Sequence, residues 1–207
     1  NIMYALVESG TITKYFNHPK GFTLGDLQYP ADIFTKWSVE EKEAIGIYEV
    51  VFDNSNFKDE KWYINTNQSF AFADETVTAS YGTATPKAHA DTLWTAQDEI
   101  DEKGIEGEIA TRGLKYNLIK DLKINVANEL ARTDWYIIRK NEVSTAIPSA
   151  ISTHRDLVRS RQATMEAQIT GAANTAALEI LYTNVNTGTE ENPVYERPLG
   201  EFPKLEL

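Results

Sequence analysis

The sequence of 207 residues predicts an α+β fold, in which a small antiparallel β-rich module precedes a C-terminal helical hairpin or bundle. In the first part of the chain, aromatic and β-branched residues alternate with polar ones, as in strands with one face in water. Beyond residue 110, apolar residues recur at helical spacing. Charge divides the chain at the same place, since residues 1–108 carry 8 Lys and Arg against 19 Asp and Glu, whereas residues 109–207 carry 12 against 12. The net charge of −11 therefore belongs entirely to the first part.

Four segments follow from these patterns. We expect residues 1–84 to form the β-rich N-terminal module, 85–110 a helix and a connector rich in glycine and acidic residues, 111–183 a helical hairpin domain, and 184–207 an extended C-terminal tail. The chain has no cysteine, which excludes disulfides, thiolate metal sites and thiol nucleophiles. The tail is polar and contains three prolines, so we expect it to be disordered or laid against a partner.

The β-rich module opens with a predicted hairpin, because apolar and polar residues alternate on both sides of a Ser9-Gly10 turn. The loop of residues 16–37 carries many apolar side chains and is expected to pack on a core. Ser38 and Glu41 predict a capping box for a short helix that ends at Gly46. The strands expected in this module occupy residues 3–7, 11–15, 47–52, 61–66 and 69–81, and their alternation indicates antiparallel pairing without showing whether the strands after residue 51 join the first sheet.

Helices are expected throughout the rest of the chain up to the tail. Thr85-Pro86 provides an N-cap and a proline at the first helical position, which predicts a helix to about Glu102. The next helix is amphipathic, with an apolar residue at every fourth position from Leu114 to Leu130. Three more helices are expected. The first is short, is capped by Thr133 or Asp134, and carries Trp135, Ile138 and Val143. The second is long and runs from Ser149 to about Ile169, with an inner face of Ile151, Leu157, Val158, Met165 and Ile169, and the last is capped by Asn174 and ends at Leu181.

The sequence offers few groups for catalysis or metal binding. Its three histidines are scattered, and we expect His89 to be solvated or to cap a helix and His154 to lie at the edge of a helix interface. The acidic run 98–102 lacks the order of carboxylates and glycine found in a calcium-binding EF-hand loop, which favours a solvated helix end. Glycine-rich phosphate loops and the common nucleophile and zinc motifs are absent. We therefore expect no enzyme activity, no cofactor and no metal.

The charge pattern also limits the partners. An acidic first part disfavours nucleic acid, whose phosphates require clustered Lys and Arg. Arg155, Arg159 and Arg161 form the one basic cluster, which we expect to make salt bridges rather than to meet RNA or lipid headgroups. The carboxylates expected to pair with it are those of Glu129, Glu142 and Asp156. No apolar run approaches the roughly 18 to 20 residues of a membrane helix, and the opening residues lack the basic flank of a signal peptide, so we expect a soluble chain without a membrane partner.

Two stretches of the chain carry specific motifs. Residues 3–50 read MYALVESGTITKY, TLGDLQYPADIF and EEKEAIGIYEV in succession. Residues 113–169 contain a T-D-W-x-x-x-R element, Thr133-Asp134-Trp135 with Arg139, followed by an I-P element, Ile147-Pro148 with Ile151, Arg155, Val158 and Arg159. Together these stretches, about half of the chain, resemble a family of bacteriophage tail and tail-fibre-associated (tail assembly) proteins. Residues 51–112 and the tail carry no such signal.

The resemblance implies a phage context and a protein–protein role rather than a reaction. Within the helical motif, we expect Asp134 to be an N-cap, Trp135 to be wedged between antiparallel helices, and Arg155 and Arg159 to face acidic side chains of the partner helix. The residues expected to contribute to partner binding are Trp135, Arg139, Arg155, Arg159, Phe202, Leu205 and Leu207.

Three functions remain open on the sequence. The first is a phage virion structural or accessory protein that is made in the host bacterial cytoplasm. It would act as an adaptor on the tail, baseplate or fibre, where it would bind other phage structural proteins in several symmetric copies. The second is a tail or tail-fibre assembly chaperone that is absent from the finished particle. The third is a carbohydrate-binding or glycan-active module, which would require a pocket with converging carboxylates, for example from Asp53, Asp59 or Glu75.

Overall fold

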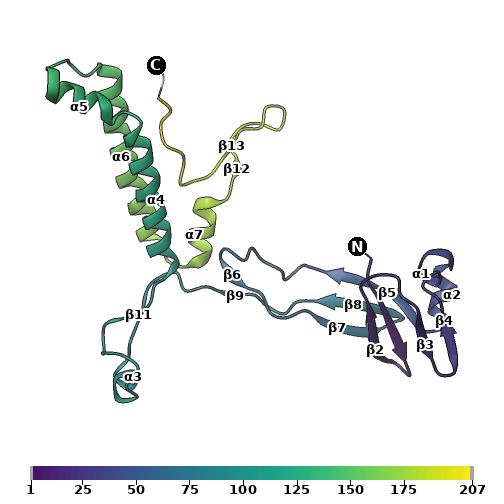
Figure 1. Ribbon diagram of the computed structural model, residues 1–207. Helices are drawn as coiled ribbons and strands as arrows, with labels where there is room; N and C mark the ends of the chain where they lie inside the picture. The colour runs from purple at the N-terminus through teal and green to yellow at the C-terminus, as the bar shows by residue number, and fades with distance from the viewer. Residues whose placement is uncertain (1, 206–207) are drawn as a thin grey trace. The chain divides into compact units, whose positions relative to one another are not determined.

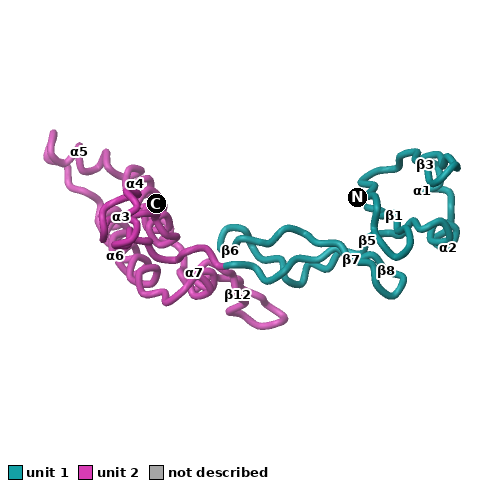
Figure 2. Tube along the Cα trace, turned by 90° about the horizontal axis from the view of Figure 1, so that it is seen from below, with its two compact units in different colours: residues 1–85 teal, residues 86–207 magenta. Residues whose placement is uncertain are grey.

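The computed structural model describes residues 2–205 and divides into two compact units, residues 1–85 and 86–207 (Figure 2). Strands dominate unit 1 and helices dominate unit 2 (Figure 1). The predicted α+β class, with the β-rich part before the helices, is therefore confirmed. None of the described helices combines the length and the apolar character that crossing a membrane requires.

Unit 1 is built on a five-stranded sheet with the order β2-β1-β5-β8-β7. Its strands are β1 (Tyr4–Glu8), β2 (Thr11–Phe16), β5 (Ile47–Asp53), β7 (Ser69–Ala73) and β8 (Thr76–Ser80). The predicted hairpin is confirmed, since β1 and β2 pair in antiparallel register, with Tyr4 opposite Phe16. Its turn uses a positive φ at Ser9 (52°) and at Gly10 (77°), a conformation that glycine adopts without steric cost.

The sheet is mixed, so the prediction of a purely antiparallel sheet is wrong. β5 and β8 run parallel, with Val50 opposite Val77 and Asp53 opposite Ser80. A parallel pair needs a connection of about a dozen residues or more. The chain between these strands supplies it and contains β6 (Tyr63–Ile64), which pairs with β9 (Thr85–Pro86), and β7, which pairs with β8 as an antiparallel hairpin.

An aromatic core forms where the loop after β2 folds back on the sheet. This loop contains β3 (Phe22–Leu24), β4 (Leu27–Tyr29), α1 (Ile33–Lys36) and α2 (Val39–Glu43). Its predicted packing is confirmed, and so is the capping box, in which Ser38 accepts from the backbone N–H of Glu41 and the Glu41 carboxylate accepts from that of Ser38. The buried core residues of this region are Tyr4, Leu6, Phe16, Phe22, Ile33, Phe34 and Ile47.

The segment that begins unit 2 differs from the prediction, because no long helix spans residues 86–102. The chain forms a short antiparallel ladder of β10 (Thr92–Leu93) and β11 (Ile109–Thr111), and only α3 (Ala96–Ile100) is helical. The capping box belongs to Thr95 and Asp98. The backbone N–H of Trp94 donates to the carbonyl of Glu108 at 2.9 Å, so cross-strand hydrogen bonds take the place of helical ones.

The helical hairpin of unit 2 is confirmed. Its helices are α4 (Leu114–Ala131), α5 (Asp134–Val143), α6 (Ser149–Gly171) and α7 (Thr175–Tyr182). α4 and α6 pack antiparallel, since the Lys115 ammonium at the start of α4 donates to the carbonyl of Thr170 near the end of α6 (2.7 Å). Asn174 caps α7 as predicted by accepting from the N–H of Ala177. The buried apolar side chains are Leu118, Leu122 and Val126 of α4, Ile151, Val158, Met165 and Ile169 of α6, and Leu178 of α7.

Two predictions for the end of unit 2 are wrong. Leu157 is 51% exposed, because the helix turns by about 100° per residue and the buried face of α6 runs through Val158. The segment after residue 184 packs on its own chain: β12 (Val185–Asn186) pairs with β13 (Tyr195–Glu196), and Leu199 is buried. The N–H of Leu199 donates to the carbonyl of Leu181 (2.9 Å), and its own carbonyl accepts from Arg161 (2.8 Å). These bonds hold the segment against α6 and α7.

Candidate partner-binding site at the corner of α4, α5 and α6

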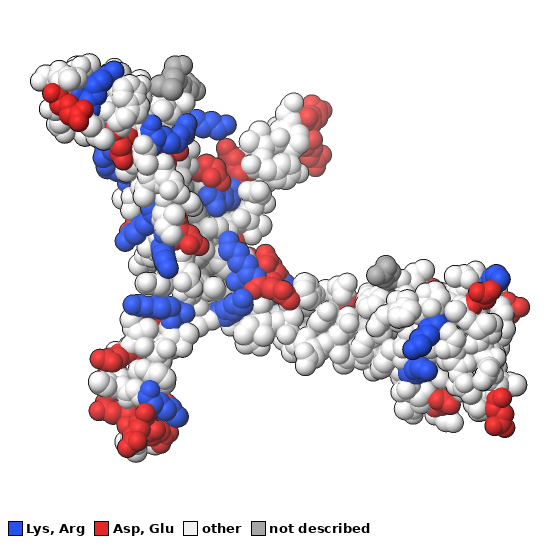
Figure 3. Space-filling model, in the orientation of Figure 1, with Lys and Arg blue, Asp and Glu red and all other residues white. Residues whose placement is uncertain are grey.

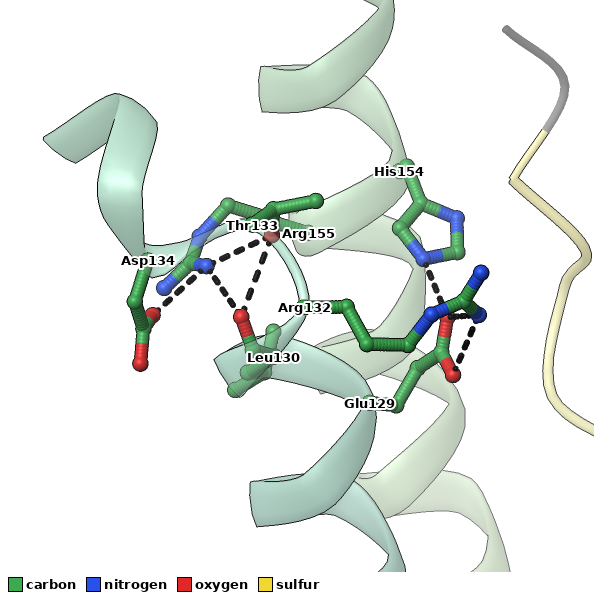
Figure 4. A network of polar contacts seen from close by, with 7 residues as sticks. All are labelled: Glu129, Leu130, Arg132, Thr133, Asp134, His154 and Arg155. Atoms are coloured by element: carbon green, nitrogen blue, oxygen red, sulfur yellow. Dashed lines mark hydrogen bonds and ion pairs between the residues drawn. The ribbon is translucent and has the colours of Figure 1, made fainter.

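The chain passes from α4 to α6 through α5, and a buried arginine holds this corner together. Arg155, in the second turn of α6, is only 8% exposed. Its Nη1 donates to the carbonyl of Leu130 (2.7 Å) and to Thr133 Oγ1 (2.8 Å), and it pairs with Asp134 Oδ1 at 2.8 Å (Figure 4). The carbonyl of Leu130 is among the last of α4, which have no partner within their own helix. This carbonyl also accepts from the backbone N–H (3.0 Å) and the hydroxyl (3.1 Å) of Thr133, so Arg155 adds a charged donor that ties the end of α4 to the start of α5.

A second polar cluster lies beside it. The Glu129 carboxylate of α4 accepts two hydrogen bonds from Arg132 (2.9 and 3.0 Å) and lies 2.9 Å from His154 Nε2 of α6 (Figure 4). His154 is 4% exposed, so it lies inside the helix interface and not at its edge as expected. Burial raises the pKa of Glu129, but the hydrogen bonds from Arg132 and His154 outweigh burial and leave that pKa below its usual value. The ionised carboxylate therefore links α4 to α6.

α5 exposes most of its apolar side chains. Trp135 is 49% exposed, Ile138 55% and Val143 66%, and no residue of α5, which is described over its whole length, is buried. The Arg139 guanidinium lies over the Trp135 ring (4.7 Å to the centroid) and near the Tyr136 ring (5.3 Å). A cation–π contact of this kind orders the three side chains, of which Tyr136 and Arg139 are half-buried and Trp135 is exposed. α5 therefore presents the Trp135 ring and the aliphatic side chains of Ile138 and Val143 to solvent, beside the half-buried side chains of Tyr136 and Arg139.

Two of the predicted roles at this corner are wrong. Asp134 is the first residue of α5 and not its N-cap, a position that Thr133 occupies. Trp135 is not wedged between antiparallel helices, because the corner is filled by the Arg155 guanidinium and the ring of Trp135 packs on its neighbour Tyr136, with ring centroids 3.9 Å apart. Arg155 pairs with Asp134 and with none of the three carboxylates expected for the basic cluster.

The remaining predicted partner-binding residues lie apart from α5. Arg159 is exposed and pairs with Asp156 at 3.4 Å, one of the expected pairings. Phe202 and Leu205 are half-buried, and Leu205 lines a shallow hollow of about 380 Å³ at the start of α6 together with Leu157. Leu207 lies outside the described residues.

Sequence reasoning missed three parts of the site. Thr133 and Glu129 bind the buried Arg155 and His154 side chains of α6, and their polar side chains at the end of an amphipathic helix were a signal of that role. The exposure of Ile138 was also missed. Its spacing from Trp135 places both on one helical face, but spacing alone does not show whether another element covers that face.

The described residues offer little for metal chemistry. Within residues 2–205, no three His, Asp or Glu side chains gather where they could hold a metal ion. Near α3, Lys103 neutralises part of the acidic run by pairing with Asp98 (3.2 Å) and Asp101 (3.1 Å). His89 is half-buried, and its carbonyl accepts from the backbone N–H of Lys115 at the start of α4.

Comparisons with known proteins do not identify a relative: no protein-family model, curated protein or solved structure matches the chain. The ordered and exposed surface of α5 is the feature with the clearest functional consequence.

Proposed function

We propose that the chain is a bacteriophage virion accessory protein, made in the host cytoplasm, that acts as a protein–protein adaptor on the tail, baseplate or fibre. The observation that carries the proposal is α5, whose start is tied to α6 by buried Arg155 while Trp135, Ile138 and Val143 face solvent. The motifs by which the sequence resembles phage tail and tail-fibre-associated proteins include Trp135 and Arg139 of this same helix, and this resemblance suggests the phage context.

The composition of this surface is suited to binding a protein. Trp, Tyr and Arg dominate the binding energy of protein interfaces, and exposed apolar groups rimmed by polar ones mark such sites. Trp135, Tyr136 and Arg139 already contact one another in the free chain. Little side-chain entropy then remains to be lost on binding, which favours affinity.

The assembly chaperone is the alternative that the same surface allows, because α5 would bind a tail or fibre protein in either case. The glycan-active alternative finds no support in the described carboxylates. Asp53 lies opposite Ser80 at one end of β8, whereas Glu75 lies in the turn before the other end of that strand. Asp53 accepts from the backbone N–H of Ser55, and Asp59 accepts from that of Lys61, so each carboxylate stabilises a local turn.

The test compares incorporation into particles of phage that carry single substitutions. Ile138→Ser removes an exposed apolar side chain of α5, and Ile180→Ser makes the same change at an equally exposed position of α7. We expect Ile138→Ser and Trp135→Ala to lower the copies per particle about tenfold or more, since hot-spot residues contribute about 2 kcal/mol or more to binding. Ile180→Ser should leave the copies unchanged. Equal incorporation of all three variants would contradict the role of α5, and absence of the wild-type chain from particles would favour the chaperone.

A further inference from the structure

The face of α4 turned away from α6 carries a second apolar stripe. The side that packs on α6 uses Leu118, Leu122 and Val126. On the opposite side, Tyr116 and Ile124 are 42% and 48% exposed, although a helix of a single hairpin needs only one apolar face. We name this surface the α4 outer face. Side chains of α4 alone leave a shallow hollow of about 500 Å³ on it, here called the groove, which is lined by Tyr116, Ile119, Lys120, Lys123, Ile124 and Ala127.

The groove has a positive border. The Lys120 ammonium makes no hydrogen bond or ion pair with any residue in the described range 2–205, and that of Lys123 reaches Glu166 only at 3.9 Å. Their long side chains can cover apolar surface while the ammonium groups remain available for carboxylates. The α4 outer face therefore suits an apolar ligand surface that carries acidic residues.

The segment 92–111, which we name the acidic arm, has this combination. It contains six Asp and Glu against one Lys, and Figure 3 shows acidic atoms gathered around α3. The apolar side chains of the arm are also uncovered, which is costly in water unless a partner covers them. The exposed fractions are 53% for Leu93, 73% for Ile100, 58% for Ile105 and 42% for Ile109.

The acidic arm is folded in advance of any contact. The capping box of Thr95 and Asp98 starts α3, and the backbone of Trp94 exchanges hydrogen bonds with Gly107 (3.0 Å) and Glu108 (2.9 Å). The indole of Trp94 packs against Gly104, where a Cβ would lie 2.3 Å from its Nε1. Binding would therefore cost little backbone entropy.

The base of the acidic arm is fixed to the start of α4 in its own chain. Asp91 accepts from the backbone N–H of Gly113 (2.7 Å) and from Arg112 (2.8 Å). Figure 1 shows α3 and α4 extending in opposite directions from this base. The groove continues to Ala127, about 21 Å along the helix from Gly113 at 1.5 Å per residue. An arm held in this way is directed away from the groove of its own chain.

We propose that the acidic arm of one copy binds the α4 outer face of a second copy. The exposed isoleucines of the arm would enter the groove, and the carboxylates of Glu102, Glu106 and Glu108 would face Lys120 and Lys123. Each copy carries both halves of the contact at different places, so the association is head-to-tail and generates a ring or an open chain of copies. This deepens the proposed function, which requires several copies, but its test uses purified protein alone.

The test measures the mass of assemblies of the full purified chain by sedimentation velocity. The wild type should form oligomers that weaken as salt is raised, because part of the contact is ionic. Ile124→Glu places a charge in the groove and Ile100→Glu places one on the arm, and each change alone should raise the dissociation constant about tenfold or more. Ile180→Glu, on the exposed side of α7, is the matched control and should assemble as the wild type does.

Mixing the two variants gives the decisive result. The Ile124→Glu chain keeps an intact arm and the Ile100→Glu chain keeps an intact groove, so the mixture should form a heterodimer and nothing larger. Circular dichroism equal to that of the wild type shows that each variant is folded. A monomeric wild type, oligomers that both variants leave intact, or a mixture without heterodimer would overturn the inference. Because no phage component is present, any of these results leaves the particle test of α5 unaffected.

Discussion

Replacing Arg155 with methionine should destabilise unit 2, because this side chain holds the corner from which α5 extends. The change keeps much of the aliphatic stem but removes the guanidinium. It therefore deletes the hydrogen bonds to the Leu130 carbonyl (2.7 Å) and Thr133 Oγ1 (2.8 Å) and the ion pair with Asp134 (2.8 Å).

The geometry indicates the size of the effect. A hydrogen bond to a charged group contributes about 1.5–3 kcal/mol, and a buried acceptor left without a donor costs about 1–3 kcal/mol. Two observations lower the sum. The Leu130 carbonyl keeps the backbone N–H (3.0 Å) and the hydroxyl (3.1 Å) of Thr133 as donors, and the side chain of Asp134 is 52% exposed and regains water. We therefore expect a loss of about 2–4 kcal/mol in the free energy of unfolding.

The assay is urea unfolding of the full chain followed by the helical circular dichroism signal, which comes mainly from unit 2. For a slope of about 2 kcal/mol per molar urea, the midpoint should fall by about 1–2 M. Arg159→Met is the matched control four residues along the same helix, where the pair with Asp156 is exposed and contributes at most about 1 kcal/mol. Equal midpoints for the two variants would refute the role assigned to Arg155.

Three further changes test other parts of the fold. Met165→Ala, at a fully buried site of α6, should cost about 2–5 kcal/mol in the same urea assay, and a loss below 1 kcal/mol would contradict the close packing of the unit 2 core around this side chain. Ser38→Ala removes one half of a capping box and should cost about 1 kcal/mol in thermal unfolding of unit 1, whereas no shift would argue against that cap. Glu129 has a lowered folded-state pKa, so its contribution to stability is present above its unfolded pKa of about 4.3 and is lost as pH falls through the folded pKa. Glu129→Gln should therefore be less stable than the wild type at neutral pH and lose less stability on acidification, and parallel pH profiles would show that the carboxylate contributes nothing.

Local signals in the sequence predicted much of the fold correctly. The Ser9-Gly10 turn, the Ser38–Glu41 capping box and the Asn174 cap each depend on hydrogen bonds or dihedral angles within a few residues. Such features need no distant partner to form. They appear in the structure where the sequence places them.

The errors arose where distant residues decide the structure. Residues 86–102 have a helical spacing of apolar side chains, but β10 finds a partner strand in β11, and the Gly104 backbone leaves room for the indole of Trp94. The parallel pairing of β5 with β8 likewise depends on a crossover that alternation along each strand does not reveal.

In the candidate site too, features set by nearby residues were predicted correctly and features set by distant residues were not. The short helix with Trp135 and Arg139 was predicted correctly from its sequence. The exposure of Trp135 was not, because the corner that it was expected to fill is occupied by the guanidinium of Arg155 from α6. Which of two large side chains enters a corner depends on hydrogen-bonding partners, here Thr133 and the carbonyl of Leu130, that only the folded chain brings together.

The most direct test of the adaptor proposal is cross-linking mass spectrometry of purified particles of the encoding phage, with peptide counts for the copies per particle. Lys140 of α5 is exposed and offers an amine beside the proposed binding surface. The proposal predicts several copies per particle and cross-links from Lys140 to another phage structural protein. Particles that lack the chain, or that contain it with Lys140 linked to no other protein, would contradict it.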